Sequence, residues 1–276
     1  MSNNTVSIIL GVDVGGSTTK IVGFKNGELL GTLQVRAADQ ITSLYGAIGN
    51  FLRVTDVKLT DVSKIALTGV GASFIDEPIY GIPTQKVDEF LAIGHGALYL
   101  TGLSEALVVS LGTGTAFVRA EPDGIVHIGG SGVGGGTIVG LASQMLNKSD
   151  VDAVIAMAEN GSLANVDLLV RDIIGSEISS LPPDLTAANF GKIKSTATEA
   201  DIAQGILNMV FQTAGMLAVF AARNDTIRDV VLIGTLTTFP QALQMQSTFS
   251  NLSDMNFVIP PHAVFATAIG AARGSV

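Results

Sequence analysis

The first residues in the chain with types and spacing suited to chemistry form one short run of an aspartate, paired glycines, hydroxyl side chains and a lysine. The run reads DVGGSTTK and follows an apolar segment, residues 6–12, that predicts a β-strand. Asp13 at the strand end is an oxygen ligand suited to Mg²⁺, directly or through water, and Lys20 can neutralise phosphate charge. Backbone N–H groups and hydroxyls that can hold phosphate oxygens come from Gly15, Gly16, Ser17, Thr18 and Thr19.

This first glycine loop is also compatible with an ordinary glycine-rich hairpin. It is not a Walker A loop, because the sequence G-x-x-x-x-G-K-[ST] is absent. It is not a Rossmann fingerprint either, since a second apolar run, residues 21–24, follows where a helix is required. The run therefore predicts a phosphate-binding turn of another class, with a plain turn as the alternative.

Two more glycine loops follow later in the chain. The second reads GTGT at residues 112–115 and ends a predicted strand, and the third reads GGSGVGGG at residues 129–136 and leads into a predicted helix at Thr137. A glycine-rich loop at a helix N-terminus is a ready anion site, although a flexible linker is the alternative. Gly234 and Thr235 end a later strand, where they could contact a nucleoside or simply close the strand.

The predicted elements around the first two loops repeat. A strand, a loop, a second strand, a turn and a third strand occur in that order around GVDVGGSTTKIVGF and again around VVSLGTGTAFVRA. Asn26-Gly27 between two apolar runs is a strong hairpin signal. We interpret this pattern as an internal duplication of an α/β unit, with one half at residues 1–103 and the other at 104–276, and with a nucleotide held between the paired hairpins.

Several helices are predicted between and after these strands. Residues 87–100, 138–146, 150–159 and 166–174 have helical patterns, and residues 199–223 form the longest such segment. The last of these has no charge and apolar residues on nearly every face from residue 206 to 222. A helix that is apolar all round must be buried, so we expect a dimer interface there, with a central core helix as the alternative.

Composition excludes several classes of function. The chain has 276 residues, no cysteine, a net charge of −9 and 47% hydrophobic residues. The acidic balance argues against nucleic-acid or anionic membrane partners, and the histidines at positions 95, 127 and 262 have no zinc spacing. The N-terminus lacks the basic region of a signal peptide, so a cytoplasmic protein is expected.

The motifs together resemble the actin/sugar kinase/heat-shock ATPase superfamily and, within it, the type II pantothenate kinases. Two of them, NVDLLVRDIIG at residues 165–175 and LTAANFGK at residues 185–192, are more specific than the glycine loops. The others are DVGGSTTK at 13–20, LTGVGA at 67–72, VDEF at 87–90, SLGTGT at 110–115, GGSGVGGGT at 129–137 and AIGA at 268–271.

This resemblance implies a duplicated actin-like, ribonuclease H-like α/β fold with the nucleotide in the cleft between its halves. It also implies a homodimer that uses ATP and Mg²⁺ to phosphorylate pantothenate, the first step toward coenzyme A. Pantothenate is expected to contact Glu89, Thr113 and His127. Beyond the first loop, the expected ATP contacts are Thr113, Gly135, Gly136, Thr137, Ile138, Val139 and Thr235.

Glu89 is the catalytic base that the resemblance implies, because the family has a glutamate at the start of this helix. A carboxylate there can accept the proton of the substrate hydroxyl as the phosphoryl group is transferred. From the residues alone, Asp88 and Glu89 are also compatible with a solvated acidic pair at a helix N-terminus. Adjacent helical residues point about 100° apart, so at most one of the two faces the site.

His127 marks a departure from the family pattern. Related kinases often carry a substrate-binding arginine immediately before the [VI]-x-G of the third loop, and here His127 occupies that position. Histidine can donate a hydrogen bond but lacks the fixed charge and bidentate geometry of arginine. The alternatives are therefore another small-molecule kinase of the superfamily, acting on an N-acetyl sugar or a pantothenate analogue, and a non-catalytic nucleotide-binding regulator.

Overall fold

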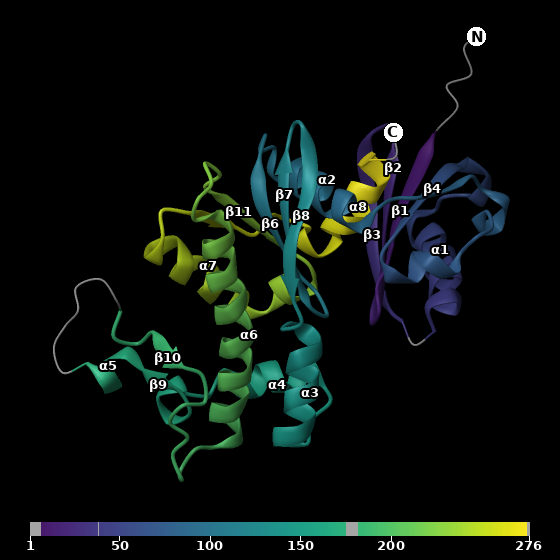
Figure 1. Ribbon diagram of the computed structural model, residues 1–276. Helices are drawn as coiled ribbons and strands as arrows, with labels where there is room; N and C mark the ends of the chain where they lie inside the picture. The colour runs from purple at the N-terminus through teal and green to yellow at the C-terminus, as the bar shows by residue number, and fades with distance from the viewer. Residues whose placement is uncertain (1–6, 38, 175–181, 275–276) are drawn as a thin grey trace.

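Two five-stranded sheets form the framework of the chain in a computed structural model that describes residues 7–37, 39–174 and 182–274 (Figure 1). The first sheet has the order β3 (Glu28–Arg36), β2 (Thr18–Lys25), β1 (Ile8–Val14), β4 (Val62–Thr68) and β5 (Thr84–Lys86). The second has the order β8 (Gly124–Ser131), β7 (Thr115–Glu121), β6 (Ala106–Leu111), β11 (Asp229–Ile233) and β12 (Asn256–Val258).

The two sheets share one topology. In each, a central strand pairs antiparallel with the next strand of the chain and parallel with a strand that returns after a crossover, as β1 does with β2 and β4 and as β6 does with β7 and β11. The Asn26-Gly27 turn joins β2 to β3 with positive φ at both residues, as a tight hairpin requires. The predicted α/β duplication is confirmed.

Two helices lie between the sheets and cross in close contact. These are α2 (Glu89–Thr101), which packs on β6 and β7, and α8 (Ala266–Gly274), which packs on β1, β2 and β4. A Cβ on Gly96 would lie 1.9 Å from the Ala266 carbonyl oxygen, and one on Gly270 would lie 1.8 Å from that of Ala92. Only glycine permits this approach, so the two backbones meet directly.

The helix α8 also links the two halves of the sequence. The helix α8 comes from the second half of the chain, yet its residues Ala268, Ile269 and Ala272 pack with Val22 and Phe24 of the first sheet. The predicted boundary at residue 103 falls between α2 and β6 and stays a prediction. The closing helix nevertheless ties the second half to the first sheet.

Helices cover the outer faces of both sheets. The face of the first sheet opposite α8 carries α1 (Gln40–Thr55), and the second sheet is covered by α6 (Glu199–Ala222) and α7 (Pro240–Leu252). Figure 1 shows α6 running past the sheet into a lower region with α3 (Gly135–Leu146) and α4 (Val151–Ala158). Among the described residues, α6 alone is long and apolar enough to span a membrane, and half of its most apolar stretch is buried in the fold.

The expected helix at residues 166–174 is wrong in its first part. The chain forms the short strand β9 (Leu168–Leu169), then a single helical turn α5 (Val170–Ile173), and β9 pairs with β10 (Thr186–Ala188). The strand replaces the helix because Asp167 is buried, and a buried carboxylate needs hydrogen-bond donors. The donors come from residues 186, 190 and 208 rather than from a local helical turn.

Candidate active site

Asp13 and Lys20 form the centre of the candidate site. They lie opposite each other on the antiparallel strands β1 and β2, and both side chains are almost completely buried. Lys20 Nζ lies 3.4 Å from Asp13 Oδ2. Burial raises the pKa of Asp13, while the charge of Lys20 and its hydrogen bond oppose that rise.

The end of β4 lies beside Asp13. Thr68 is level with Asp13 across the parallel β1–β4 ladder. Its Oγ1 is buried with no hydrogen-bond partner among the described residues. Gly69 follows with φ of +87°, and a Cβ there would lie 2.5 Å from Asp13 Oδ1. A carboxylate beside an open hydroxyl is a donor set that suits a hydrated Mg²⁺ ion.

Asp88 and Glu89 have separate roles in this geometry. Asp88 is the N-cap of α2, and one of its carboxylate oxygens accepts hydrogen bonds from the backbone N–H groups of Phe90 at 2.9 Å and Leu91 at 3.0 Å. Glu89, the first helical residue, is half-buried. Burial raises the pKa of Glu89, the charges of Asp13 and Asp88 add to the rise, and Lys20 opposes it. Glu89 is thus the carboxylate that shares an electrostatic environment with Asp13 and Lys20.

His127 reaches the same region from the second sheet. Its ring stacks on that of Phe90, with the centroids 3.9 Å apart and the planes 12° apart. Because Phe90 directly follows Glu89, the fold brings His127 on β8 beside the start of α2. His127 is exposed, so it remains accessible to a ligand.

The second and third glycine loops lie against each other at the end of β6. The backbone N–H of Gly135 donates to the Gly112 carbonyl at 2.9 Å, and that of Gly136 donates to the Thr113 carbonyl at 2.8 Å. Thr235 begins a short 3-10 turn directly after β11, the parallel neighbour of β6. The structure therefore gathers the later predicted nucleotide contacts at one sheet edge.

Several of the residues expected to contact the nucleotide have side chains that are buried or backbone N–H groups that are already paired. Thr19 is fully buried and lies next to Lys20 on β2, so its side chain faces the α1 side of the sheet, away from Asp13. The side chain of Ile138 is fully buried in the core of the second half. The N–H groups of Gly135 and Gly136 already have carbonyl partners. Of the other expected contacts, Gly16, Ser17, Thr113 and Val139 are exposed.

Three residues around the site carried no predicted role. Thr68 and Gly69 belong to the LTGVGA motif, and Phe90 belongs to VDEF. The strand ending at a glycine was the available signal for the first two, because parallel strands end at the same sheet edge. Nothing local marked Phe90 as the stacking partner of a histidine far along the chain.

Solved structures share this duplicated, actin-like α/β fold. An activator of 2-hydroxyisocaproyl-CoA dehydratase from Clostridium difficile with bound ADPNP superposes with a TM-score of 0.69 at 16% identity, covering 96% of this chain and 92% of that one. The ROK hexokinase from Thermus thermophilus superposes with a TM-score of 0.57 at 14% identity, covering 96% and 97%. These likenesses confirm the predicted fold.

The family model described as Fumble matches residues 104–273, and the chain belongs to this family. Curated relatives include the type II pantothenate kinase of Bacillus cereus, which is 26% identical over 254 residues and 89% of each chain. The type II pantothenate kinase of Oceanobacillus iheyensis is 28% identical over 244 residues, 85% of this chain and 87% of that protein. The predicted resemblance to this group of kinases is confirmed.

Proposed function

We propose that this protein transfers the γ-phosphoryl group of ATP to the hydroxyl of pantothenate. The names of its curated relatives support this reaction. The observation that carries it is the pairing of roles at the start of α2, where Asp88 caps the helix and leaves Glu89 beside Asp13 and Lys20. A base, a metal-binding carboxylate and a phosphate-neutralising cation are the groups that phosphoryl transfer needs.

Each of these groups has a distinct part in the proposed reaction. Asp13, with Thr68 beside it, would hold Mg²⁺, which neutralises phosphate charge when bound. Lys20 attracts the phosphates and holds the Asp13 carboxylate in place. Glu89 takes the proton of the substrate hydroxyl as the new P–O bond forms and the bond to ADP breaks. Its raised pKa makes it a stronger base than a free glutamate.

His127 is the proposed contact for the far end of the substrate. Pantothenate ends in a carboxylate, and the exposed His127 ring beside Phe90 can donate a hydrogen bond to it. The same residue supports a second candidate, another small-molecule kinase of this superfamily, because a histidine here offers less fixed charge than arginine.

An ATP-consumption assay over a substrate panel tests the proposal. Pantothenate, an N-acetyl sugar and a no-acceptor control are compared in wild type and in Glu89→Gln. Consumption that requires pantothenate and disappears in the variant supports the kinase. Consumption driven by the sugar selects the second candidate, and ATP binding without consumption selects a regulator.

The proposal also covers the two halves of the chain, the oligomeric state and the location of the protein. We place the first phosphate loop and Glu89 in residues 1–103, and the other two loops with the dimerisation helix in residues 104–276. On α6, Met209, Met216 and Phe220 remain half-buried or exposed in the single chain, and we assign this stripe to a homodimer. The protein is proposed to act in the cytoplasm, without nucleic-acid or membrane partners.

A further inference from the structure

Three parallel strands of the first sheet end at the same edge, and the candidate site residues lie along that edge. The strands stand in the order β1, β4 and β5, so β4 is the middle one. Asp13 lies near the end of β1, and Glu89 follows β5 at the start of α2. A molecule that reaches from Asp13 to Glu89 along this edge therefore passes the turn that follows β4, residues 69–71.

Val70 is the one residue of this turn that carries a side chain. A Cβ on Gly69 would lie 2.5 Å from Asp13 Oδ1, and one on Gly71 would lie 2.3 Å from Val14 Cγ1. Both glycines therefore pack directly on β1. The Val70 side chain between them is 59% exposed. The turn thus holds an apolar side chain in the open, on a backbone that β1 fixes at both neighbouring residues.

Val70 and Glu89 leave neighbouring strands. Leu67 of β4 is opposite Lys86 of β5, and the Val87 N–H donates to the Leu67 carbonyl at 2.8 Å. Val70 and Glu89 each follow that cross-strand pair by three residues. Neighbouring strands lie about 4.8 Å apart, so the exposed valine stands beside the proposed base.

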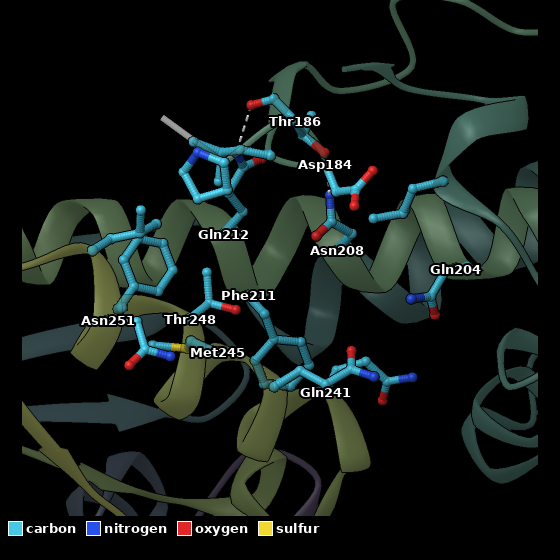
Figure 2. A pocket seen from close by; sticks show the side chains of 16 residues that line it. Asp184, Thr186, Gln204, Asn208, Phe211, Gln212, Gln241, Met245, Thr248 and Asn251 are labelled. Carbon is cyan, nitrogen blue, oxygen red and sulfur yellow. Dashed lines mark hydrogen bonds between the residues drawn. The ribbon is translucent and has the colours of Figure 1, made fainter. Parts of the chain in front are cut away.

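A cavity elsewhere in the fold does not supply surface next to Glu89. Figure 2 shows this cavity, of about 460 Å³, with Asn208 and Gln212 on one side and Gln241 and Met245 on the other. Its described lining residues all lie between positions 163 and 252, whereas the first sheet ends at residue 86. The apolar surface at the strand ends of the first sheet therefore comes from other residues, of which Val70 is one.

We propose that Val70 contacts the phosphoryl acceptor next to its reacting hydroxyl and selects an acceptor with alkyl groups there, an inference that rests on the proposed transfer to pantothenate. In pantothenate, the carbon next to the reacting CH₂OH group carries two methyl groups. Packing of these methyl groups on Val70 removes apolar surface from water. The carbons next to a sugar hydroxyl carry oxygen atoms instead, which an apolar side chain cannot hydrogen-bond.

Steady-state kinetics with pantothenate, and with its analogue that lacks the two methyl groups, test this contact. Val70→Thr keeps the shape of the side chain but replaces one methyl group by a hydroxyl. It is expected to lower kcat/KM for pantothenate about tenfold, the low end of what one methylene-sized contact contributes to discrimination, and to leave kcat/KM for the analogue nearly unchanged. Val70→Ala, a second variant, should reduce the preference for pantothenate at least as far. A fall of equal size for both substrates, or no fall for either, overturns the proposal.

Val54→Thr is the matched control, because Val54 is 53% exposed near the C-terminal end of α1, away from these strand ends. It should leave kcat/KM for both substrates unchanged, and an equal loss of preference in this variant overturns the proposal. Both valines are exposed, so both threonine variants should keep the wild-type melting temperature. If the wild type phosphorylates neither compound, the proposed reaction fails and this inference fails with it. If it phosphorylates both with a preference that does not depend on residue 70, only this inference fails.

Discussion

Asp13 and Lys20 are cross-strand partners whose side chains are 8% and 7% exposed, with 3.4 Å between Lys20 Nζ and Asp13 Oδ2. A buried ion pair contributes little net stability compared with an apolar pair, but loss of one partner leaves a buried charge uncompensated. The pair therefore couples the fold of the β1–β2 hairpin to the charge of the candidate site.

Removal of one partner of this pair should destabilise the protein more than removal of both. Lys20→Met is expected to cost about 3–5 kcal/mol of unfolding free energy, and Asp13→Asn combined with Lys20→Met should recover part of that loss. Urea unfolding of both variants measures the effect.

Asp13→Asn alone should impair Mg²⁺-dependent turnover. A single Asp13→Asn variant with wild-type rate and metal dependence would remove Asp13 from the metal site.

Glu89→Gln is expected to lower kcat about 10²–10⁴-fold, the usual contribution of a positioned base, with ATP binding retained. Asp88→Asn, which keeps a side chain able to cap α2, serves as the matched control and should stay near wild-type kcat. Steady-state kinetics measure kcat for both variants, and an ATP-binding titration shows whether each variant still binds ATP. If Asp88→Asn proves the damaging change, the base is misassigned.

The raised pKa of Glu89 sets the sign of the pH dependence. The base acts only when ionised, so kcat should fall as pH drops through a pKa that burial and the neighbouring acidic charges hold above 4.5. The acidic limb of the kcat profile should therefore lie at higher pH than a free glutamate would give. The pH profile of the residual activity of Glu89→Gln should lack this acidic limb. An acidic limb that persists in the variant would belong to the titration of another group.

His127 should contribute to substrate affinity. Its exposed ring stacks on Phe90 beside the start of α2, so His127→Ala is expected to raise KM for pantothenate about tenfold, the loss of one hydrogen bond to a charged group, with little change in kcat. His127→Arg should lower KM, because arginine offers a fixed charge and a bidentate contact. Steady-state kinetics measure both variants, and an unchanged KM in His127→Ala would mean that another group holds the substrate carboxylate.

Asp201 at the start of α6 should matter for acid stability. Partial desolvation alone would raise its pKa, but hydrogen bonds from the backbone N–H groups of Thr198 and Ser162, and from the side chains of Thr198 and Asn165, lower it to about 2. The carboxylate therefore stabilises the fold above about pH 4, its unfolded pKa. This contribution is lost as pH falls through about 2.

Asp201→Asn is expected to cost about 1–3 kcal/mol at neutral pH. The difference from wild type in urea unfolding should shrink between about pH 4 and pH 2. An unchanged difference across that range would show that the charge of Asp201 does not supply the stability.

The half-exposed stripe on α6 should hold two copies together. Phe220 is 57% exposed in the single chain, and Met216 lies one turn before it on the same side of the helix. Light scattering should give twice the 28.4 kDa chain mass for wild type and the monomer mass for Met216→Glu combined with Phe220→Glu. A wild-type monomer, with α6 acting only as a core helix, refutes the dimer.

The sequence by itself determined the features that depend on neighbours in the chain. Asn26-Gly27 predicts its hairpin because both residues tolerate positive φ. Asp13 was placed at a strand end because an apolar run stops there. The helix from Glu199 follows from a long segment that carries no charge from residue 206 to 222 and is apolar on nearly every face, and its Thr198–Asp201 capping box agrees with the predicted start. The duplication was visible because both halves repeat the same order of strands and glycine loops.

Only the tertiary structure decided the features that depend on contacts between distant residues. It made Asp88 the N-cap of α2, placed the Thr19 side chain on the face of the first sheet opposite Asp13, and packed α8 on that sheet. It also replaced an expected helix with β9, because Asp167 finds its partner Asn208 on α6, 41 residues along the chain. Local periodicity records which side of an element is apolar, but it does not record which distant element covers that side.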